Sequence, residues 1–262
     1  MLDLARPSSA RHQASDANLI VQVYRIAASV LLKVDEPNLA LLAADRAVTA
    51  AGGNPLSAAT AAISLAQTLR ALGRYRLAMA TSIAAAHRTT LTASDEAPPE
   101  RLSVYGALLI QAALAASRCG DTGSVSELIQ QAREIATRFS DGADHRQTCF
   151  GPTAVELAQV LATADLGDVP GAIRLHEAVI RRDGWQRLAA EHRAAFLLGI
   201  ARTYLQAGNM LAAGHILKEA HRAAPAEILY APSARALVAD VARSGSQSSG
   251  VSRLATALGL TR

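Results

Sequence analysis

The segment ALGRYRLA, residues 71–78, ends one apolar helical stretch at its glycine and begins another immediately afterwards. Three later segments repeat this design: RCGDTGSV at 118–125, DLGDVPGA at 165–172 and QAGNMLAA at 206–213. In each, a glycine suited to the left-handed end of a helix stands five residues before a small apolar residue, which lets two helices approach closely. These glycines are therefore predicted to be the turns of helix hairpins: Gly73, Gly120, Gly167 and Gly208.

The spacing of these turns predicts a repeat architecture. The four glycines follow one another at steps of 47, 47 and 41 residues, and Asp35 with Ala40 extends the register 38 residues upstream of Gly73. A single hairpin cannot bury its apolar face alone, so a period of this length is typical of stacked helix pairs. We expect an all-α, right-handed solenoid of about five tetratricopeptide-like hairpins with a C-terminal capping helix.

Proline, glycine and serine positions divide the chain into three parts. Residues 1–16 are expected to be disordered, residues 17–243 to form the repeat domain, and residues 244–262 to form a flexible linker and a short terminal helix. Within the repeat domain the longer connections fall at 52–54, 90–99, 140–151 and 183–188. All of them join one hairpin to the next, so they should emerge along the same edge of the stack.

Composition narrows the class of protein. Half of the residues are hydrophobic but only 3% are aromatic, a balance typical of close-packed helices rich in Ala and Leu. The net charge is +4, and of 26 basic residues only Lys33 and Lys218 are lysines. Because the arginines are dispersed along the chain, we expect no specific nucleic-acid binding by this chain alone. The longest uncharged run, residues 102–117, is too short to span a bilayer, and a cytoplasmic protein is expected.

Residue patterns for catalysis or metal binding are not found. The seven histidines have no ligand spacing, and the sequence holds neither a phosphate-binding glycine loop nor a Gly-x-Ser-x-Gly elbow. We therefore expect no enzyme activity, no metal and no cofactor. Cys119 and Cys149 fall at opposite ends of one expected hairpin, so both are predicted to be reduced and buried.

Polar residues recur at helical spacing on the first helices of several hairpins, which line the concave groove of right-handed helix-pair solenoids. The stripes are Asn18, Gln22, Arg25 and Ser29; Ser57, Thr60, Ser64 and Gln67; and Glu156, Gln159 and Thr163. Such a groove suits a peptide or a small polar ligand, although an ordinary solvated helix face has the same pattern. Gln111 is a stronger candidate, because it interrupts an apolar helix where an unpaired amide would be costly.

The loop DHRQTCFGPT, residues 144–153, is the most distinctive stretch of the chain. It combines an acid, an imidazole and an aromatic ring before the Gly-Pro that opens a helix. We expect Asp144, His145 and Phe150 to fold back against the mouth of the groove, near Tyr105 or Gln111. They would either contact a ligand there or hold the stack together, with Phe150 as a plug and Asp144 as a cap.

Three segments carry a resemblance to a known family: LLAADRA at 41–47, SVYGALL at 103–109 and the loop DHRQTCFGPT. From about Val23 to Leu260 the chain resembles the tetratricopeptide-like effector region of actinobacterial Xre-type helix-turn-helix transcriptional regulators. In that family a DNA-binding domain precedes the repeats, which are thought to sense a ligand or mediate dimerisation. Residues 1–16 are too few to hold such a domain, so we expect the effector region without it.

The residues and the resemblance together indicate a non-enzymatic domain that senses a ligand or binds a protein, with a homodimer as an implied state. The alternative is a structural adaptor that docks a partner protein's peptide in its groove. The candidate ligand-binding residues are Arg25, Gln67, Tyr105, Gln111, Asp144, His145, Phe150, Glu156 and Gln159.

Overall fold

Helices make up nearly all of the regular structure. The computed structural model describes residues 6–90, 97–243 and 249–260. Their helices are α1 (Arg6–Lys33), α2 (Pro37–Ala50), α3 (Pro55–Ala71), α4 (Tyr75–Thr90), α5 (Pro99–Arg118), α6 (Thr122–Ala136), α7 (Pro152–Asp165), α8 (Val169–Val179), α9 (Asp183–Arg187), α10 (Ala190–Gln206), α11 (Met210–Ala223), α12 (Ala226–Leu229), α13 (Pro232–Arg243) and α14 (Ser249–Ala257), with a 3₁₀ turn, η1, at His145–Gln147.

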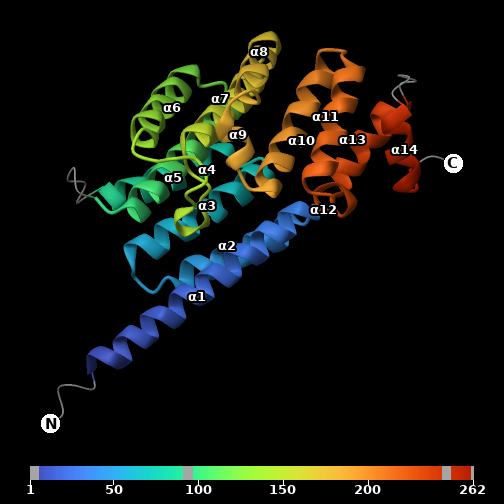
Figure 1. Ribbon diagram of the computed structural model, residues 1–262. Helices are drawn as coiled ribbons and strands as arrows, with labels where there is room; N and C mark the ends of the chain where they lie inside the picture. Colours follow the sequence, from blue (N-terminus) through green and yellow to red (C-terminus); the bar gives the residue numbers. More distant parts are fainter. Residues whose placement is uncertain (1–5, 91–96, 244–248, 261–262) are drawn as a thin grey trace.

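The helices form a repeat stack, which confirms the predicted all-α solenoid (Figure 1). The hairpins are α1/α2, α3/α4, α5/α6, α7/α8 and α10/α11, and the first helix of each packs on the first helix of the next. Helix α13 packs on α11 and covers the C-terminal end. Buried alanines dominate the N-terminal interfaces, whereas larger residues such as Phe196 and Leu217 fill the core around α10 and α11.

All five hairpin turns share one backbone design. The four predicted glycines have φ between 72° and 92°, and Asp35 takes the same left-handed conformation with φ 58°. In every turn the amide after the left-handed residue donates to the carbonyl five residues earlier, at 2.8–3.2 Å. This bond satisfies a carbonyl that the end of the helix would leave unpaired. The small residues five positions later are buried, so the predicted register holds from Asp35 to Gly208.

Several boundaries differ from the expected ones. Helix α1 begins at Arg6 instead of Ala17, because Pro7 is compatible with a first helical turn and the residues after it favour helix. Residues 183–187, expected as a loop, form α9, whose Trp185 is buried against Phe196. The expected linker at 244–248 lies outside the described residues. Cys119 is exposed and Cys149 half-buried, so the expectation that both cysteines are buried is wrong; Cys119 caps a helix at a solvated turn.

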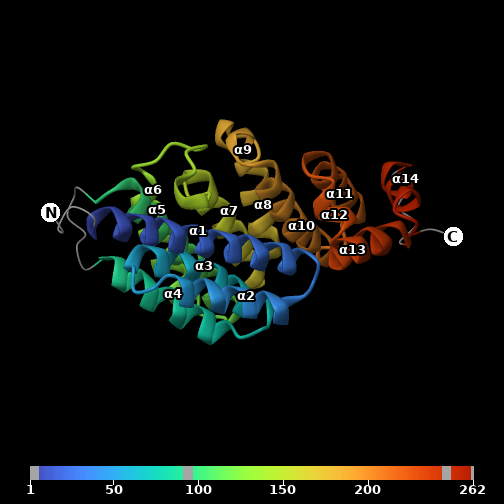
Figure 2. The ribbon, with the colours of Figure 1, turned by 90° about the horizontal axis from the view of Figure 1, so that it is seen from below.

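The two ends of the stack meet. The Lys33 ammonium at the end of α1 pairs with the buried Glu227 carboxylate of α12, and Asp35 Oδ2 accepts a hydrogen bond of 2.7 Å from the Ser233 amide. Figure 1 shows the end of α1 beside α12, and Figure 2 shows α1 extending along the molecule toward this contact. The first hairpin therefore crosses the concave side and joins the last helices.

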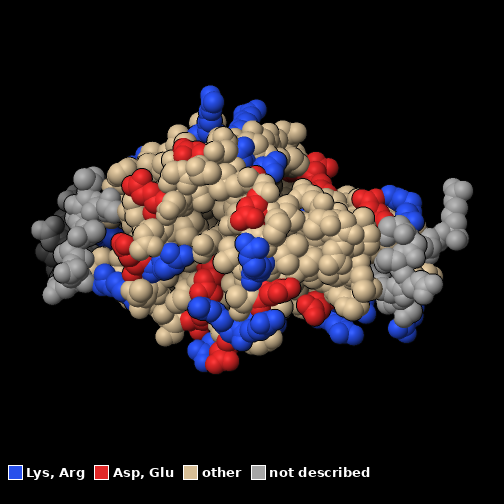
Figure 3. Space-filling model, turned by 90° about the horizontal axis from the view of Figure 1, so that it is seen from above, with Lys and Arg blue, Asp and Glu red and all other residues tan. Residues whose placement is uncertain are grey.

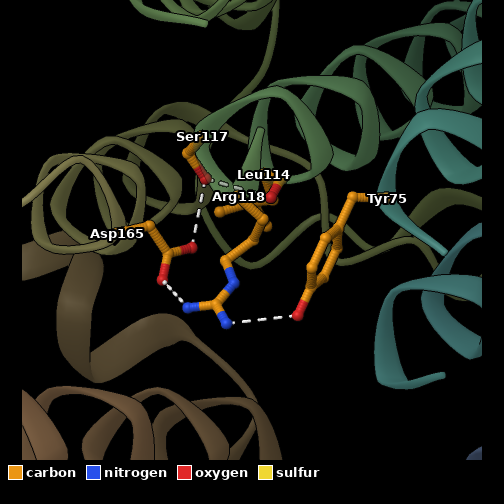
Figure 4. A network of polar contacts seen from close by, with 5 residues as sticks. All are labelled: Tyr75, Leu114, Ser117, Arg118 and Asp165. Carbon is orange, nitrogen blue, oxygen red and sulfur yellow. Dashed lines mark hydrogen bonds and ion pairs between the residues drawn. The ribbon is translucent and has the colours of Figure 1, made fainter. Parts of the chain in front are cut away.

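A polar network fastens the second, third and fourth hairpins at their turn ends (Figure 4). Arg118 on α5 donates to Asp165 on α7 and to the Tyr75 hydroxyl on α4, at 3.1 Å each, and stacks over the Tyr75 ring. The Ser117 hydroxyl lies 3.1 Å from the other carboxylate oxygen of Asp165. This carboxylate is consequently engaged on both oxygens.

Surface charge and hydropathy agree with a well-solvated helical stack. Acidic and basic side chains are interspersed on the face drawn in Figure 3, with broad uncharged areas between them. Within the described residues, helices are too short or too polar to cross a membrane.

Candidate functional site

The concave side of the stack encloses a cavity of about 510 Å³. Its walls come from the first helices of all five hairpins, α1, α3, α5, α7 and α10, and from residues 147–149 of the loop before α7. A volume of this size is typical of sites for small ligands. The closure of the stack by α1 therefore converts the expected open groove into a partly enclosed site.

The walls of the cavity differ in polarity. Helices α1, α3 and α5 contribute most of the polar side chains, which are Arg25, Ser29, Ser64, Gln67, Arg70 and Gln111. Helix α7 contributes only alanines and leucines, and α10 adds Phe196, Ala195 and His192. An occupant that is polar on one side and apolar on the other would match both walls.

Arg25 lies where α1 meets the loop before α7. Its side chain is 8% exposed, and its terminal nitrogens donate to Gln22 Oε1 at 2.7 Å and to the carbonyls of Arg146 and Gln147 at 3.1 and 3.3 Å. The buried Nε has no hydrogen-bond partner within the described residues. Burial, with the nearby charge of Arg146, lowers the pKa of Arg25 to about 10. The guanidinium thus stays charged at neutral pH despite its burial.

Arg70 forms a second cationic point at the other end of α3. One terminal nitrogen donates to Gln111 Oε1 at 2.8 Å, which pairs the amide that interrupts the apolar helix α5. The Arg70 Nε is buried without a partner among the described residues. Burial lowers the pKa of Arg70, while the charge of Asp165 acts in the opposite direction. Gln111 therefore holds Arg70 against the cavity wall.

Negative charge is missing from the cavity wall. None of the residues that line the cavity is an aspartate or glutamate. Burial also lowers the pKa of His192, so this ring is mainly neutral at pH 7. Two buried guanidinium groups thus lie beside the cavity without a carboxylate to neutralise them, an arrangement that is costly unless an anion enters.

The loop before α7 is fastened to several helices. Asp141 accepts from the Thr153 amide at 3.0 Å and from its hydroxyl at 2.8 Å, and the Ser103 hydroxyl on α5 bonds Thr148. Arg146 reaches Asn18 Oδ1 on α1 at 3.1 Å. These contacts hold the loop across the concave side.

The same loop is strained. Arg146, Gln147 and Cys149 have φ of 58°, 54° and 51°, a left-handed conformation that is unfavourable for residues other than glycine. The turn that results directs residues 147–149 to the cavity, whereas Phe150 is buried against Gly106 and packs edge-on to Phe139 at 5.5 Å. Backbone strain of this kind concentrates at functional sites.

The structure separates the predicted candidates into two groups. Arg25, Gln67 and Gln111 line the cavity. The remaining candidates do not: Tyr105, Asp144, His145, Phe150, Glu156 and Gln159.

Most of the second group have contacts that explain their position. Glu156 pairs with Arg182, and Gln159 Oε1 accepts from Arg133 at 2.8 Å. Asp144 Oδ1 accepts from the Cys149 amide at 2.8 Å, and the His145 ring packs on Phe139. These side chains stabilise the stack and the loop.

Two cavity residues were missed by the sequence reasoning. Arg70 lies three positions after Gln67, so extending the polar stripe of α3 by one turn would have found it. His192 stands alone on α10 and no pattern marks it. Among the described residues there is also no group of three or more His, Cys, Asp or Glu side chains placed to hold a metal ion.

Comparison with known proteins yields structural likenesses alone. No protein-family model and no curated protein matches the chain. Among solved structures, YrrB, described as a TPR protein with an unusual peptide-binding site, is 18% identical with a TM-score of 0.35, over 77% of this chain and 85% of that one.

A putative kinesin light chain from Podosopora anserina with nearly identical TPR-like repeats is 20% identical with a TM-score of 0.45, over 78% and 94% of the two chains. A variant of that protein gives 20% and 0.46, over 78% and 93%.

Proposed function

We propose that this protein is a non-enzymatic sensor domain that binds a small molecule or a short peptide in its central cavity. The observation that carries the proposal is the cavity itself, built by the first helices of all five hairpins and holding polar groups whose bonding capacity is not filled. A ligand there would contact every repeat at once. Its binding would therefore stabilise the whole stack.

The resemblance to effector regions of Xre-type regulators supports a role in ligand sensing, with a DNA-binding domain supplied separately. The alternative, an adaptor that docks a partner protein's peptide, requires a groove along which an extended chain can lie. Helix α1 and the loop before α7 cross that path through the bonds of Arg25 to the carbonyls of Arg146 and Gln147. These contacts favour a compact ligand.

A thermal-shift screen against metabolite and short-peptide libraries tests the proposal. A ligand at a hundredfold excess over its Kd should stabilise the protein by about 2.7 kcal/mol. The control is Ala195→Trp: Ala195 is exposed and lines the cavity, so an indole there would fill the site without disturbing the core. Stabilisation that persists in this variant would place the ligand elsewhere and refute the proposal.

Dimerisation of the sensor is a second proposal, favoured by an exposed apolar strip on α1. Its members are Leu19, Val23, Ile26 and Val30, which are 64%, 57%, 53% and 52% exposed. Their alternating steps of four and three residues are those of a coiled-coil seam. In an antiparallel pair each member would face another member of the same strip, so a second copy fits it. Analytical ultracentrifugation should show a dimer for the native chain and a monomer for Val23→Glu; two monomers would refute it.

A further inference from the structure

The polarity of the cavity narrows the class of ligand, an argument that rests on the proposed function. Arg25 and Arg70 both line the site, and each keeps a buried Nε–H without an acceptor within the described residues. An occupant with acceptor atoms would satisfy donors that the protein leaves unpaired. Buried unpaired donors are uncommon in folded proteins, so their presence at one cavity indicates a missing partner.

The carboxylates closest in effect to these two arginines are already engaged. Asp165, which acts on Arg70, is bonded through both oxygens to Arg118 and Ser117 (Figure 4). Asp144, which acts on Arg25, accepts from the Cys149 amide. Both lie outside the cavity wall, so the charge of the two guanidinium groups is open to an anion that enters the cavity.

The opposite wall gives the rest of the ligand its character. Helix α7 presents Ala154, Leu157, Ala158 and Leu161, and α10 adds the ring of Phe196. A charged group fully surrounded by water would have no use for this wall, and an apolar molecule would leave the arginines unpaired. Both walls are satisfied together by a molecule with an anionic group at one side and an apolar body at the other.

We infer that the cavity binds an amphipathic anion, with a carboxylate or phosphate group held by Arg25 and Arg70 and an apolar body packed against α7 and Phe196. Guanidinium groups suit both anions, because their planar donors match pairs of oxygen atoms. The neutral polar side chains between the two arginines, Ser64, Gln67 and Gln111, can accept or donate further bonds to the same group.

Two fluorescent probes with the same ring system separate charge from apolar contact. Anilinonaphthalenesulfonate carries an anion, and phenylnaphthylamine is its neutral counterpart. The full chain should bind the anionic probe at least about tenfold more tightly than the neutral one. Arg70→Gln should weaken the anionic probe by roughly 10- to 100-fold, the usual effect of losing a charge-assisted bond, and leave the neutral probe unchanged.

Matched variants control for folding and for surface charge. Arg70→Lys keeps the charge and should retain most of the affinity, and Arg46→Gln removes an exposed charge on α2 and should have no effect. Arg70 is preferred to Arg25 because Arg25 also holds the loop before α7. A glutamine at position 70 can still donate to Gln111, so the fold should persist, as unchanged circular dichroism and melting temperature would verify.

Competition by decanoate and by decyl phosphate then distinguishes the two anions, since the one that displaces the probe at lower concentration names the preferred head group. Equal binding of both probes, with no effect of Arg70→Gln, would overturn the anion inference and leave the cavity as the binding site. If Ala195→Trp left both probes bound as before, the cavity would not be their site, and the proposed function would fail as well.

Discussion

The contact between Gly106 and Phe150 gives a sharp test of how the loop before α7 is anchored. A Cβ added at Gly106, in the middle of α5, would lie 2.1, 2.3 and 2.6 Å from three atoms of the Phe150 ring. Phe150 is 2% exposed and is held edge-on by Phe139, so the ring has little room to move. The glycine is therefore required by the ring, although helix propensity alone would favour alanine.

The magnitudes follow from three opposing effects. In an open helix interior Gly→Ala stabilises by about 1 kcal/mol, and overpacking a core costs about 1–3 kcal/mol. Overlap with three ring atoms places the cost at the upper end, so Gly106→Ala should destabilise by roughly 2 kcal/mol. Phe150→Ala should cost about 3–5 kcal/mol. In the Phe150→Ala background the added methyl meets empty space, and Gly106→Ala should stabilise by about 1 kcal/mol.

The coupling energy is thus about 3 kcal/mol, with a change of sign between the two backgrounds. Urea unfolding followed by far-UV circular dichroism measures all four proteins. Gly123→Ala on α6 is the matched control, because its Cβ would meet only Asp121 Oδ1, at 3.7 Å. Stabilisation by Gly106→Ala in the native background, or equal effects in both backgrounds, would refute the proposed anchoring of the loop by Phe150.

Three further predictions concern single groups. Asp35→Ala should cost about 1–2 kcal/mol, since it loses the acceptor for the first amide of α13 in a left-handed turn, whereas Asp35→Asn keeps both features and should change urea stability by less than about 0.5 kcal/mol. Burial lowers the pKa of His176 from 6.5 to about 4, so the unfolded chain alone takes up the proton between these values. Stability should therefore fall by about 3 kcal/mol as pH falls from 6.5 to 4; His176→Phe should abolish this loss and exposed His215→Gln should not, by urea titration at each pH. Burial raises the pKa of Cys149 to about 11, so iodoacetamide at pH 8 should alkylate exposed Cys119 roughly 100-fold faster, and equal rates by mass spectrometry would contradict the structure.

The repeat turns could be predicted because their causes are local. A left-handed residue, a helix-ending bond and a buried small residue five positions later are all written within eight residues of sequence, which is why even the non-glycine turn at Asp35 was found. Helix α9 could not be predicted in this way. Its Trp185 is ordered by contact with Phe196 on α10, a contact between parts of the chain that the local pattern does not connect.

The site was predictable only where helical periodicity marks it. Arg25, Gln67 and Gln111 were found because a first helix repeats its inward face every three or four residues. The loop before α7 was expected at the groove mouth, and it does lie against α5 through Ser103 and Thr148. Its cavity-lining residues are nevertheless 147–149 and not Asp144, His145 or Phe150, because three consecutive departures into left-handed conformation reverse which side chains face inward.

Strain and unbalanced charge lie together on one side of the cavity. The turns of the stack are satisfied by repeated backbone bonds, and carboxylates such as Asp165 and Glu227 are paired with cations. By contrast, the wall where α1 meets the loop before α7 combines left-handed Arg146 and Gln147 with the buried charge of Arg25. Sequences that otherwise agree with their fold break local rules at functional sites. An anion at this wall would offset the cost of the buried charge, and the loop whose carbonyls bind the same guanidinium would be the first segment to respond to it.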